Sequence, residues 1–556
     1  MIRRQFLAHA LRAAVASAAA SMGARGAFAQ HAGHDMDDMP GMEGMGDMHD
    51  MHNMAGMPGM SSPAAQPAAS ALASPNALPA GAPLAPLRKL ANESGDPGTF
   101  RATLVAQPVS RQLMPGKQTS FWLYGDAAKG PIIGPLIEVH EEDTVEIRFV
   151  NRLPQPSTVH WHGLPVPPDQ DGNPSDPVAP GESRVYRFTL PRGSAGTYWY
   201  HPHPHTMSAG QVYRGLAGPI IVRAADDPLA AWPERHLFFT DLKLAADGAV
   251  APNDLMDWMN GREGQFVLVN GARQPRIVVA RDERWRVWNG CNARYLRLSL
   301  GVSYPFAQVG TDGGLLGDAR DGLTELLLAP GERAELIVRA GQWPSQTALT
   351  AAVYDRRKMA MTTGNMHGSL TPDPARVLAD VRFAPAGAAA GAAPTSHALP
   401  SPLRPIEALQ PPAGVVATQK SVVFSEEMDM AAMHRPDATM SEMPAGMKFM
   451  INGATFDASR IALTSRRGDI EHWSIENRTD MDHPFHLHGT QFQIIERERE
   501  GKKMPEPFLA WRDTVNVRPG ETVRIATVQK MPGERMFHCH ILEHEDLGMM
   551  ATLKVV

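Results

Sequence analysis

The stretch HCHILEHEDLGMM (538–550) carries more chemical information than any other part of the chain. Five of its side chains are candidate copper ligands: His538, Cys539, His540, His544 and Met549. A thiolate, imidazoles and a distant thioether are the ligands typical of a blue-copper electron-transfer site. Successive side chains of a β-strand point to opposite faces, so Cys539 would face away from its two neighbouring histidines. One strand would then contact two metal centres.

Three further histidine pairs share this spacing. They lie in HWHG (160–163), YHPHPH (200–205) and HPFHLHG (483–489) and comprise His160 and His162, His201 and His203, and His486 and His488. The i, i+2 spacing places both imidazoles of a pair on one face of a strand. One such pair would more simply be a chance doublet on a polar strand. Four pairs, one of them enclosing one of only two cysteines, indicate a compact cluster of three coppers.

His483 stands at an odd offset from His486, so we expect it on the opposite face of its strand. It would join Cys539, His544 and Met549 at a separate copper. Cys539 is then committed to a metal, and we expect no disulfide. Cys291, the other cysteine, is expected to pack as a small buried apolar side chain.

The whole arrangement resembles the multicopper oxidases, a family that includes laccases, ascorbate oxidase and bacterial cuprous oxidases. The histidine motifs of that family are all present, and the likeness extends to WRVWNGCNARYL (285–296), TDGGLL (311–316) and QVYRGLAGPI (211–220). It spans roughly residues 100 to 556 and is nearest to the copper-tolerance oxidases of the bacterial periplasm. The resemblance implies four copper ions: one of type 1, one of type 2 and two of type 3.

The resemblance also assigns a role to each matching position. His160 and His486 would hold the type 2 copper. The type 3 pair would be held by His162, His201, His203, His488, His538 and His540. The type 1 copper would be held by His483, Cys539 and His544, with Met549 as its weak axial ligand. Asp171 and Glu545 would supply protons to the cluster, whereas His205 matches no ligand and is expected to pack or to form hydrogen bonds.

These assignments predict an oxidase that takes single electrons from a donor at the type 1 copper. Electrons would pass through Cys539 to His538 and His540, and the three-copper cluster would reduce O₂ to water. Two methionine-rich segments, described below, favour Cu(I) as the donor and hence copper detoxification. A laccase acting on phenols or other small organic donors is the alternative. A copper-sequestering protein is an alternative of another class, although storage needs no cysteine joined to a second metal site.

Composition restricts the partners and the compartment. Lys and Arg number 53 against 59 Asp and Glu, a net charge of −6, which gives no reason to expect a nucleic acid partner. Residues 1–29 read as a twin-arginine signal peptide: an arginine pair at Arg3 and Arg4, a weakly apolar stretch and a small-residue cleavage site at 27–29. We therefore expect an exported, periplasmic monomer without stable membrane insertion, since the apolar stretch is too short.

A strand–turn–strand pattern occurs three times. VEIRFVN (145–151), WRVWN (285–289) and HWSIEN (472–477) are each followed by a Pro-Gly turn that leads into alternating apolar and polar residues, at 179–188, 329–338 and 518–527. The repeat predicts an all-β chain of three consecutive cupredoxin-like Greek-key β-sandwich domains. We place them at 97–224, 225–385 and 414–556, with a flexible linker at 386–413. The middle domain has no paired histidines and is expected to be a spacer.

Two segments are rich in methionine. In residues 31–60 methionine recurs at every third position, a period that fits neither a strand nor a helix, and we expect a disordered tail over 30–96. Its thioethers suit Cu(I) gathering. The second segment contains Met428, Met430, Met433, Met440, Met443 and Met447. By resemblance it would cover the type 1 site. Met481, two residues before His483, is a further candidate to contact incoming copper, as are Asp480 and Asp482, although an acid next to His483 could instead serve phenolic substrates or be solvated.

Overall fold

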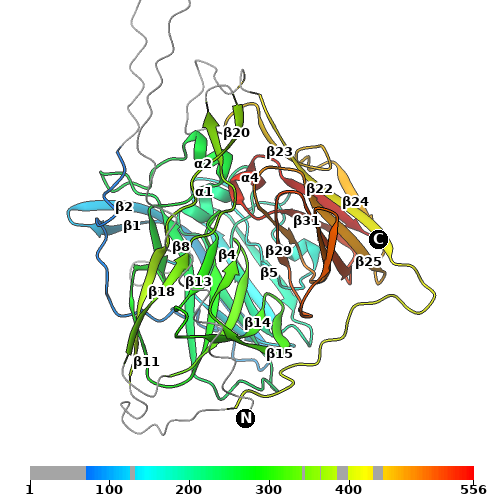
Figure 1. Ribbon diagram of the computed structural model, residues 1–556, viewed down its shortest axis with the longest axis horizontal. Coiled ribbons are helices and arrows are strands. Elements are labelled where there is room, and N and C mark those ends of the chain that lie inside the picture. Colours follow the sequence, from blue (N-terminus) through cyan, green and yellow to red (C-terminus); the bar gives the residue numbers. More distant parts are fainter. Residues whose placement is uncertain are drawn as a thin grey trace, which may run out of the picture. The chain divides into compact units, whose positions relative to one another are not determined.

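The computed structural model describes residues 71–125, 132–340, 345–362, 365–384, 398–429, 432 and 443–556, all within one compact unit, Pro67–Val556. Strands dominate this part, and they form three successive β-sandwiches (Figure 1). The predicted all-β class with three cupredoxin-like domains is confirmed. The signal peptide and the period-three methionine segment lie outside the described residues.

The first sandwich pairs a four-stranded sheet with a three-stranded sheet. The larger sheet has the order β2 (Lys117–Tyr124), β1 (Thr99–Met114), β4 (Thr144–Asn151), β5 (Ser183–Thr189). The smaller has the order β3 (Ile137–His140), β7 (Gly218–Arg223), β6 (Gly196–Tyr200). The short helices η1 (Pro168–Gln170) and α1 (Ser208–Tyr213) belong to the same stretch.

The middle sandwich is the largest. Its seven-stranded sheet has the order β10 (Ala272–Arg273), β9 (Phe266–Val269), β8 (Glu234–Leu242), β12 (Glu283–Asn289), β17 (Arg333–Val338), β14 (Phe306–Thr311), β15 (Gly314–Leu323). The facing sheet has the order β11 (Arg276–Val279), β21 (Arg376–Phe383), β18 (Ser345–Ala352), β13 (Leu296–Ser299), β16 (Leu326–Leu328). A hairpin of β19 (Met359–Thr362) and β20 (Asn365–Ser369) and the helix α2 (Leu255–Asn260) extend from it.

The third sandwich has two sheets of similar size. One has the order β23 (Met447–Ile451), β22 (Thr418–Met428), β25 (Ile470–Asn477), β30 (Glu521–Val528), β27 (Phe492–Arg499), β28 (Lys502–Pro505). The other has the order β24 (Ile461–Ser465), β32 (Met550–Val555), β31 (Gly533–Cys539), β26 (His483–Leu487), β29 (Thr514–Val517). The helix α4 (Leu542–Asp546) follows β31 and packs against α1 and α2 (Figure 1).

The repeated sequence pattern corresponds to one repeated strand arrangement. β4, β12 and β25 each pair in parallel with the first strand of their sandwich and antiparallel with the strand that follows the Pro-Gly turn. Each ends in a buried asparagine: Asn151, Asn289 or Asn477. In all three, the side-chain amide donates to two backbone carbonyls and its oxygen accepts from the N–H two residues on. The asparagine thus fixes the corner where the strand ends.

Part of the expected disordered tail is structured. Residues 71–96 form isolated β-bridges to the first and middle sandwiches, at Leu72–Ala245, Ala80–Arg273, Pro83–Arg276 and Lys89–Leu136. Leu78 and Leu87 are buried there. The prediction of disorder up to residue 96 is therefore wrong for this part, because leucines spaced along the Ala/Pro-rich stretch supply enough apolar surface to dock it.

The linker is only partly described. Residues 385–397 lie outside the described part of the chain, whereas residues 398–413 contain no helix or strand. Hydrogen bonds nevertheless attach this second part to the sandwiches: Leu403 N–H donates to Gly317 O at 2.7 Å and Leu409 N–H to the Gln493 side chain at 2.7 Å. This part is held in place along the surface.

Candidate metal centres

The cysteine and two histidines form one buried group at the end of the third sandwich. His483 Nδ1 lies 3.3 Å from Cys539 Sγ and 3.2 Å from His544 Nδ1. All three side chains are fully buried, as is Met549, whose N–H donates to the His544 carbonyl. His483 begins β26, Cys539 ends β31, and α4 brings His544 back towards them. We call this the cysteine site.

The eight paired histidines converge on the junction of the first and third sandwiches. His160–His488 and His162–His486 stack with ring centroids 3.7 Å apart. Three overlapping groups place one ligand atom from each member within 4.8 Å of the others: His160, His486 and His488; His160, His162 and His201; and His203, His488 and His538. We call this set, with His540, the eight-histidine cluster. Neighbouring pairs come from different sandwiches, so neither terminal sandwich holds it alone.

The alternation of side chains on β31 explains how two sites arise from three consecutive residues. Cys539 faces the core of the third sandwich, where it packs in the same cluster as Met481 and Met549. His538 points the other way, with its Nε2 3.2 Å from His203 Nε2 and 3.0 Å from His488 Nε2. The covalent backbone between Cys539 and the adjoining histidines is thus the link between the two sites.

The donors of both sites suit a metal. Burial is the main cause that lowers the pKa of seven histidines of the cluster, namely His162, His201, His203, His486, His488, His538 and His540, and it lowers the pKa of His483 to about 3. These imidazoles are therefore neutral and free to donate lone pairs. Several buried ring nitrogens, including His160 Nε2, His162 Nδ1 and His486 Nε2, have no hydrogen-bond partner. Burial also raises the pKa of the Cys539 thiol, so a bound cation is needed to form the thiolate there.

Two acids that the sequence singled out contact the eight-histidine cluster. Asp171 Oδ1 lies 3.0 Å from His160 Nδ1 and its Oδ2 lies 3.2 Å from His488 Nδ1, so one carboxylate connects two cluster members. Glu545 lies 3.5 Å from His203 Nδ1 and 3.4 Å from His538 Nδ1. Burial and the neighbouring charge of Asp546 raise the pKa of Glu545 well above its usual value.

The structure adds residues that the sequence interpretation missed. Asp513 Oδ1 accepts a hydrogen bond from His162 Nε2 at 3.0 Å, and its backbone carbonyl accepts one from His486 Nδ1 at 2.8 Å. Met259 O, in α2 of the middle sandwich, accepts from His544 Nε2 at 3.1 Å. Asp513 immediately precedes β29, but no spacing to another metal-binding residue marks it in the sequence.

The other sequence candidates are distributed over both surface and core. Met447 and Met481 are buried, Met428 is half-buried against the same core, and Met443 is exposed. Met430, Met433 and Met440 lie outside the described residues. Asp480 is exposed, whereas Asp482 is buried and accepts from Tyr354 at 2.6 Å and from Asn516 at 2.7 Å.

Two further expectations concern packing. His205 stacks edge-on against Phe456 with centroids 4.8 Å apart, in keeping with a packing role. Cys291 is buried in the middle sandwich, as expected of a small apolar side chain.

Comparisons with known proteins agree with this geometry. Family models described as multicopper oxidase match residues 427–556 and 107–227. The multicopper oxidase mco of Staphylococcus haemolyticus is 31% identical over 438 residues, which cover 77% of this chain and 83% of that protein. The chain belongs to the multicopper oxidase family. Copper is therefore its cofactor, and it is an oxidoreductase of the laccase-like kind. Multicopper oxidases use O₂ and a reducing substrate.

Solved structures of other multicopper oxidases share the fold. One is the Campylobacter jejuni enzyme described as a metallo-oxidase, 40% identical with a TM-score of 0.79, covering 88% of this chain and 98% of that one. A laccase from Pediococcus acidilactici is 30% identical with a TM-score of 0.69, covering 86% and 95%. In the described part of this oxidase, no helix is long and apolar enough to span a bilayer.

Proposed function

We propose that this oxidase takes electrons from Cu(I) at the cysteine site and passes them to O₂ at the eight-histidine cluster, in the service of copper detoxification in the periplasm. The main observation in favour of Cu(I) as the donor is that His483 and His544 are completely buried beneath methionine-bearing elements. A bulky phenol has no exposed imidazole edge to approach. A small, soft cation needs only thioethers to reach the site.

The covering elements support this donor. The ring of Phe449 in β23 stacks on His544 with centroids 3.8 Å apart. Met428 and Met447 are register partners at the facing ends of β22 and β23, so they form the base of the methionine-rich connection. Met481 and Met549 pack in the core beside Cys539. Thioethers thus approach the cysteine site from its cover and from its interior.

The assignment of the metal ligands follows the sequence expectation. His483, Cys539, His544 and Met549 hold the type 1 copper, His160 and His486 the type 2 copper, and His162, His201, His203, His488, His538 and His540 the type 3 pair. Four coppers, when bound, supply one-electron oxidation at one site and four-electron reduction of O₂ to water at the other.

The protein itself supplies positions and protons. Cys539 and the adjoining His538 and His540 provide a short covalent path between the sites. Glu545, whose pKa is raised by burial, delivers a proton beside His203 and His538. Asp171 orients His160 and His488 and serves as the second proton relay. Export by the twin-arginine route, a monomeric state and domains at 97–224, 225–385 and 414–556 complete the proposal.

The donor is tested by replacing thioethers without changing side-chain size. Met430, Met433, Met440 and Met443 are changed together to leucine, which preserves volume but cannot bind copper. We expect kcat/KM for Cu(I) to fall about tenfold or more while phenol oxidation is unchanged. Met504→Leu, at an exposed methionine on β28, is the matched control. Undiminished Cu(I) oxidation in the fourfold variant would refute Cu(I) as the donor that these residues serve.

The class of function is tested separately with Cys539→Ser. An oxidase loses its absorption near 600 nm, expected from copper–thiolate charge transfer, together with O₂ uptake. Copper tolerance of cells carrying the variant is then lost as well. A sequestering protein would retain tolerance, because copper storage by the methionine-rich segments does not depend on this cysteine.

A further inference from the structure

The middle sandwich was expected to be a spacer, yet one of its arginines reaches the eight-histidine cluster through a single carboxylate. Arg333, the first residue of β17, is 1% exposed at its side chain. Its guanidinium donates to both carboxylate oxygens of Asp513, at 2.7 and 2.6 Å. This fork-to-fork geometry fixes the orientation of a carboxylate as well as its charge.

All the N–H groups of the Arg333 guanidinium are used. Besides Asp513, they donate to the backbone carbonyls of Thr197 at 2.9 Å, Gly331 at 3.0 Å and Asp312 at 3.1 Å. Thr197 belongs to the first sandwich, Asp312 and Gly331 to the middle one, and Asp513 to the third. Arg333 therefore stands where the three sandwiches meet, and each of them supplies an acceptor.

Asp513 passes this orientation on to the cluster. Its Oδ1, which Arg333 holds, accepts the Nε2–H of His162 at 3.0 Å and the Thr514 hydroxyl at 2.9 Å. A proton on Nε2 leaves the lone pair of His162 on Nδ1, and Nδ1 is a buried atom with no hydrogen-bond partner. The carboxylate thus selects the tautomer of His162 that presents Nδ1 to a metal.

The glycine of the HWHG motif makes room for this contact. Gly163 has a φ of +85°, and a Cβ there would overlap both the Asp513 carboxylate and the Arg333 guanidinium. The residue next to His162 therefore lacks a side chain where the ion pair lies. The glycine of the motif therefore has a steric role: it leaves space for the ion pair. The spacing of the histidines alone does not explain why a glycine stands there.

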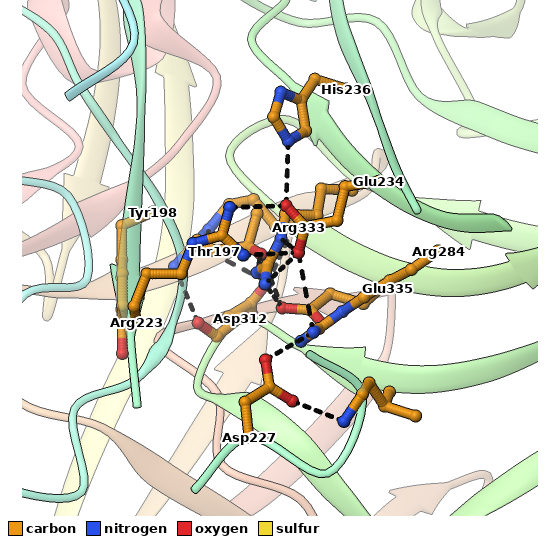
Figure 2. A network of polar contacts seen from close by, with 12 residues as sticks. Thr197, Tyr198, Arg223, Asp227, Glu234, His236, Arg284, Asp312, Arg333 and Glu335 are labelled. Atoms are coloured by element: carbon orange, nitrogen blue, oxygen red, sulfur yellow. Dashed lines mark hydrogen bonds and ion pairs between the residues drawn. The ribbon is translucent and has the colours of Figure 1, made fainter. Parts of the chain in front are cut away.

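A larger ion-pair network lies beside the arginine. Figure 2 shows Arg333 beside Thr197 and Glu335. The Thr197 hydroxyl donates to Glu335 at 2.7 Å, and Arg284 donates to the other oxygen of Glu335 at 2.5 Å and to Asp227 at 2.6 Å. The network continues to Glu234, which accepts from Arg223 (Figure 2). Arg284 is buried like Arg333, but its guanidinium donates to Asp227 and Glu335 and not to Asp513.

We propose that Arg333 is a positioning residue for the eight-histidine cluster: it fixes Asp513, which in turn holds the Nε2–H of His162 and directs Nδ1 to the metal. This inference rests on the proposed function of the cluster as the O₂-reducing copper site. It makes the middle sandwich part of that site, although the sandwich supplies none of the proposed ligands.

The test compares Arg333→Met with Arg284→Met in the full chain. Both remove a buried guanidinium of one network, but only the first leaves Asp513 unpaired. We expect Arg333→Met to lower copper affinity at the cluster by about 10–100-fold, as changes to groups that orient metal-binding histidines do. This affinity is measured as the copper content that remains after dialysis against a series of chelator concentrations. The absorption near 600 nm should remain, because the cysteine site does not contact Arg333.

Arg284→Met should lower the unfolding temperature while leaving copper affinity at the cluster unchanged. Wild-type copper affinity in Arg333→Met, or an equal loss in Arg284→Met, would overturn the proposal, because either result reduces the arginine to a general structural role. If Arg333→Met does not fold, Arg333→Lys and Asp513→Asn decide. Each keeps the volume but breaks the paired contact, so each should weaken copper retention and alter the electron paramagnetic resonance spectrum of the cluster copper.

Measurements on the wild-type protein distinguish a failure of the role of Arg333 from a failure of the proposed oxidase function. If copper-loaded wild type shows no absorption near 600 nm and consumes no O₂, the proposed function fails, whatever the variants do. If the wild type behaves as an oxidase and Arg333→Met and Arg333→Lys retain its copper and its spectrum, only the role of Arg333 fails.

Discussion

Gly331 lies directly against the imidazole of His540. A Cβ at position 331 would stand 2.9 Å from ring atom Cδ2 and 3.0 Å from Cγ, closer than side chains approach one another, and φ there is +85°. The glycine belongs to the Pro-Gly turn that leads into β17. The middle sandwich therefore touches the eight-histidine cluster with bare backbone, two residues before Arg333.

Gly331→Ala should reduce both the stability of the protein and its copper binding, because of the backbone conformation at residue 331 and because of the contact with His540. The left-handed backbone costs an alanine about 1–3 kcal/mol, and the added methyl group pushes the ring of His540 away from its neighbours. We expect a lower unfolding temperature and weaker copper retention. Gly181→Ala is the matched control: Gly181 is the equivalent turn glycine of the first sandwich, with a φ of +84° and nothing within 4 Å of a Cβ. Equal copper retention in the two variants would contradict the contact argument.

Glu545→Gln tests proton delivery. The substitution keeps the shape of the side chain next to His203 and His538 but removes the proton that burial makes the carboxyl retain. Loss of a positioned general acid costs about 10²–10⁴-fold in rate. We therefore expect O₂ uptake to fall about a hundredfold, with copper content and the absorption near 600 nm unchanged. Turnover within a few-fold of the wild type would exclude Glu545 as the proton donor.

Glu234→Gln should destabilise the metal-free protein in a pH-dependent way. Burial would raise the pKa of Glu234, but hydrogen bonds from His236 and Arg223 and the charge of Arg286 outweigh it and hold the pKa well below its usual range. A carboxylate with a lowered folded-state pKa stabilises the fold above its unfolded value, about 4.3, and this stabilisation is lost as the pH falls below it. At pH 7 we expect a loss of about 3–5 kcal/mol.

The loss should shrink when urea unfolding is repeated near pH 3.5, because the wild-type carboxylate is then progressively protonated in the unfolded chain. Glu427→Gln provides the comparison, since the pair of Glu427 with Lys448 is largely exposed and contributes about 1 kcal/mol at most. A Glu234→Gln effect that did not change with pH would indicate that shape, and not charge, holds the network together.

Truncation distinguishes the two halves of the N-terminal tail. A chain beginning at residue 71 keeps the docked segment, whereas a chain beginning at residue 97 loses the burial of Leu78 and Leu87. Burying one leucine contributes about 1.5–3 kcal/mol. We expect the shorter chain to unfold at a lower temperature by differential scanning calorimetry. Identical unfolding of the two chains would show that the segment adds nothing to stability.

The sequence was sufficient to predict those parts of the fold and of the candidate site that depend on the spacing of residues along one strand. The i, i+2 histidine pairs and the odd offset of His483 predicted which side chains share a face, because strand geometry fixes that alternation. The threefold pattern predicted equivalent strands, and Asn151, Asn289 and Asn477 have the same hydrogen bonds in each copy. Such features require no knowledge of how the sandwiches dock.

Contacts between sandwiches could not be predicted in this way. Arg333 stands in APGERAELIV, where its neighbours give no hint that it lies beneath a metal cluster, and Asp513 is 180 residues away in sequence. Met259 contacts His544 through a backbone carbonyl, which no side-chain pattern reveals. The docked segment 71–96 was missed because its low-complexity composition concealed leucines placed to bury apolar surface.

The separation of the cluster members along the chain also constrains how the protein is made. His203 and His538, whose ring nitrogens lie 3.2 Å apart, are 335 residues apart in sequence. While the ribosome is still translating the third sandwich, the first can offer copper only half of a binding site. The complete metal set can therefore be acquired only after the third sandwich has been synthesised.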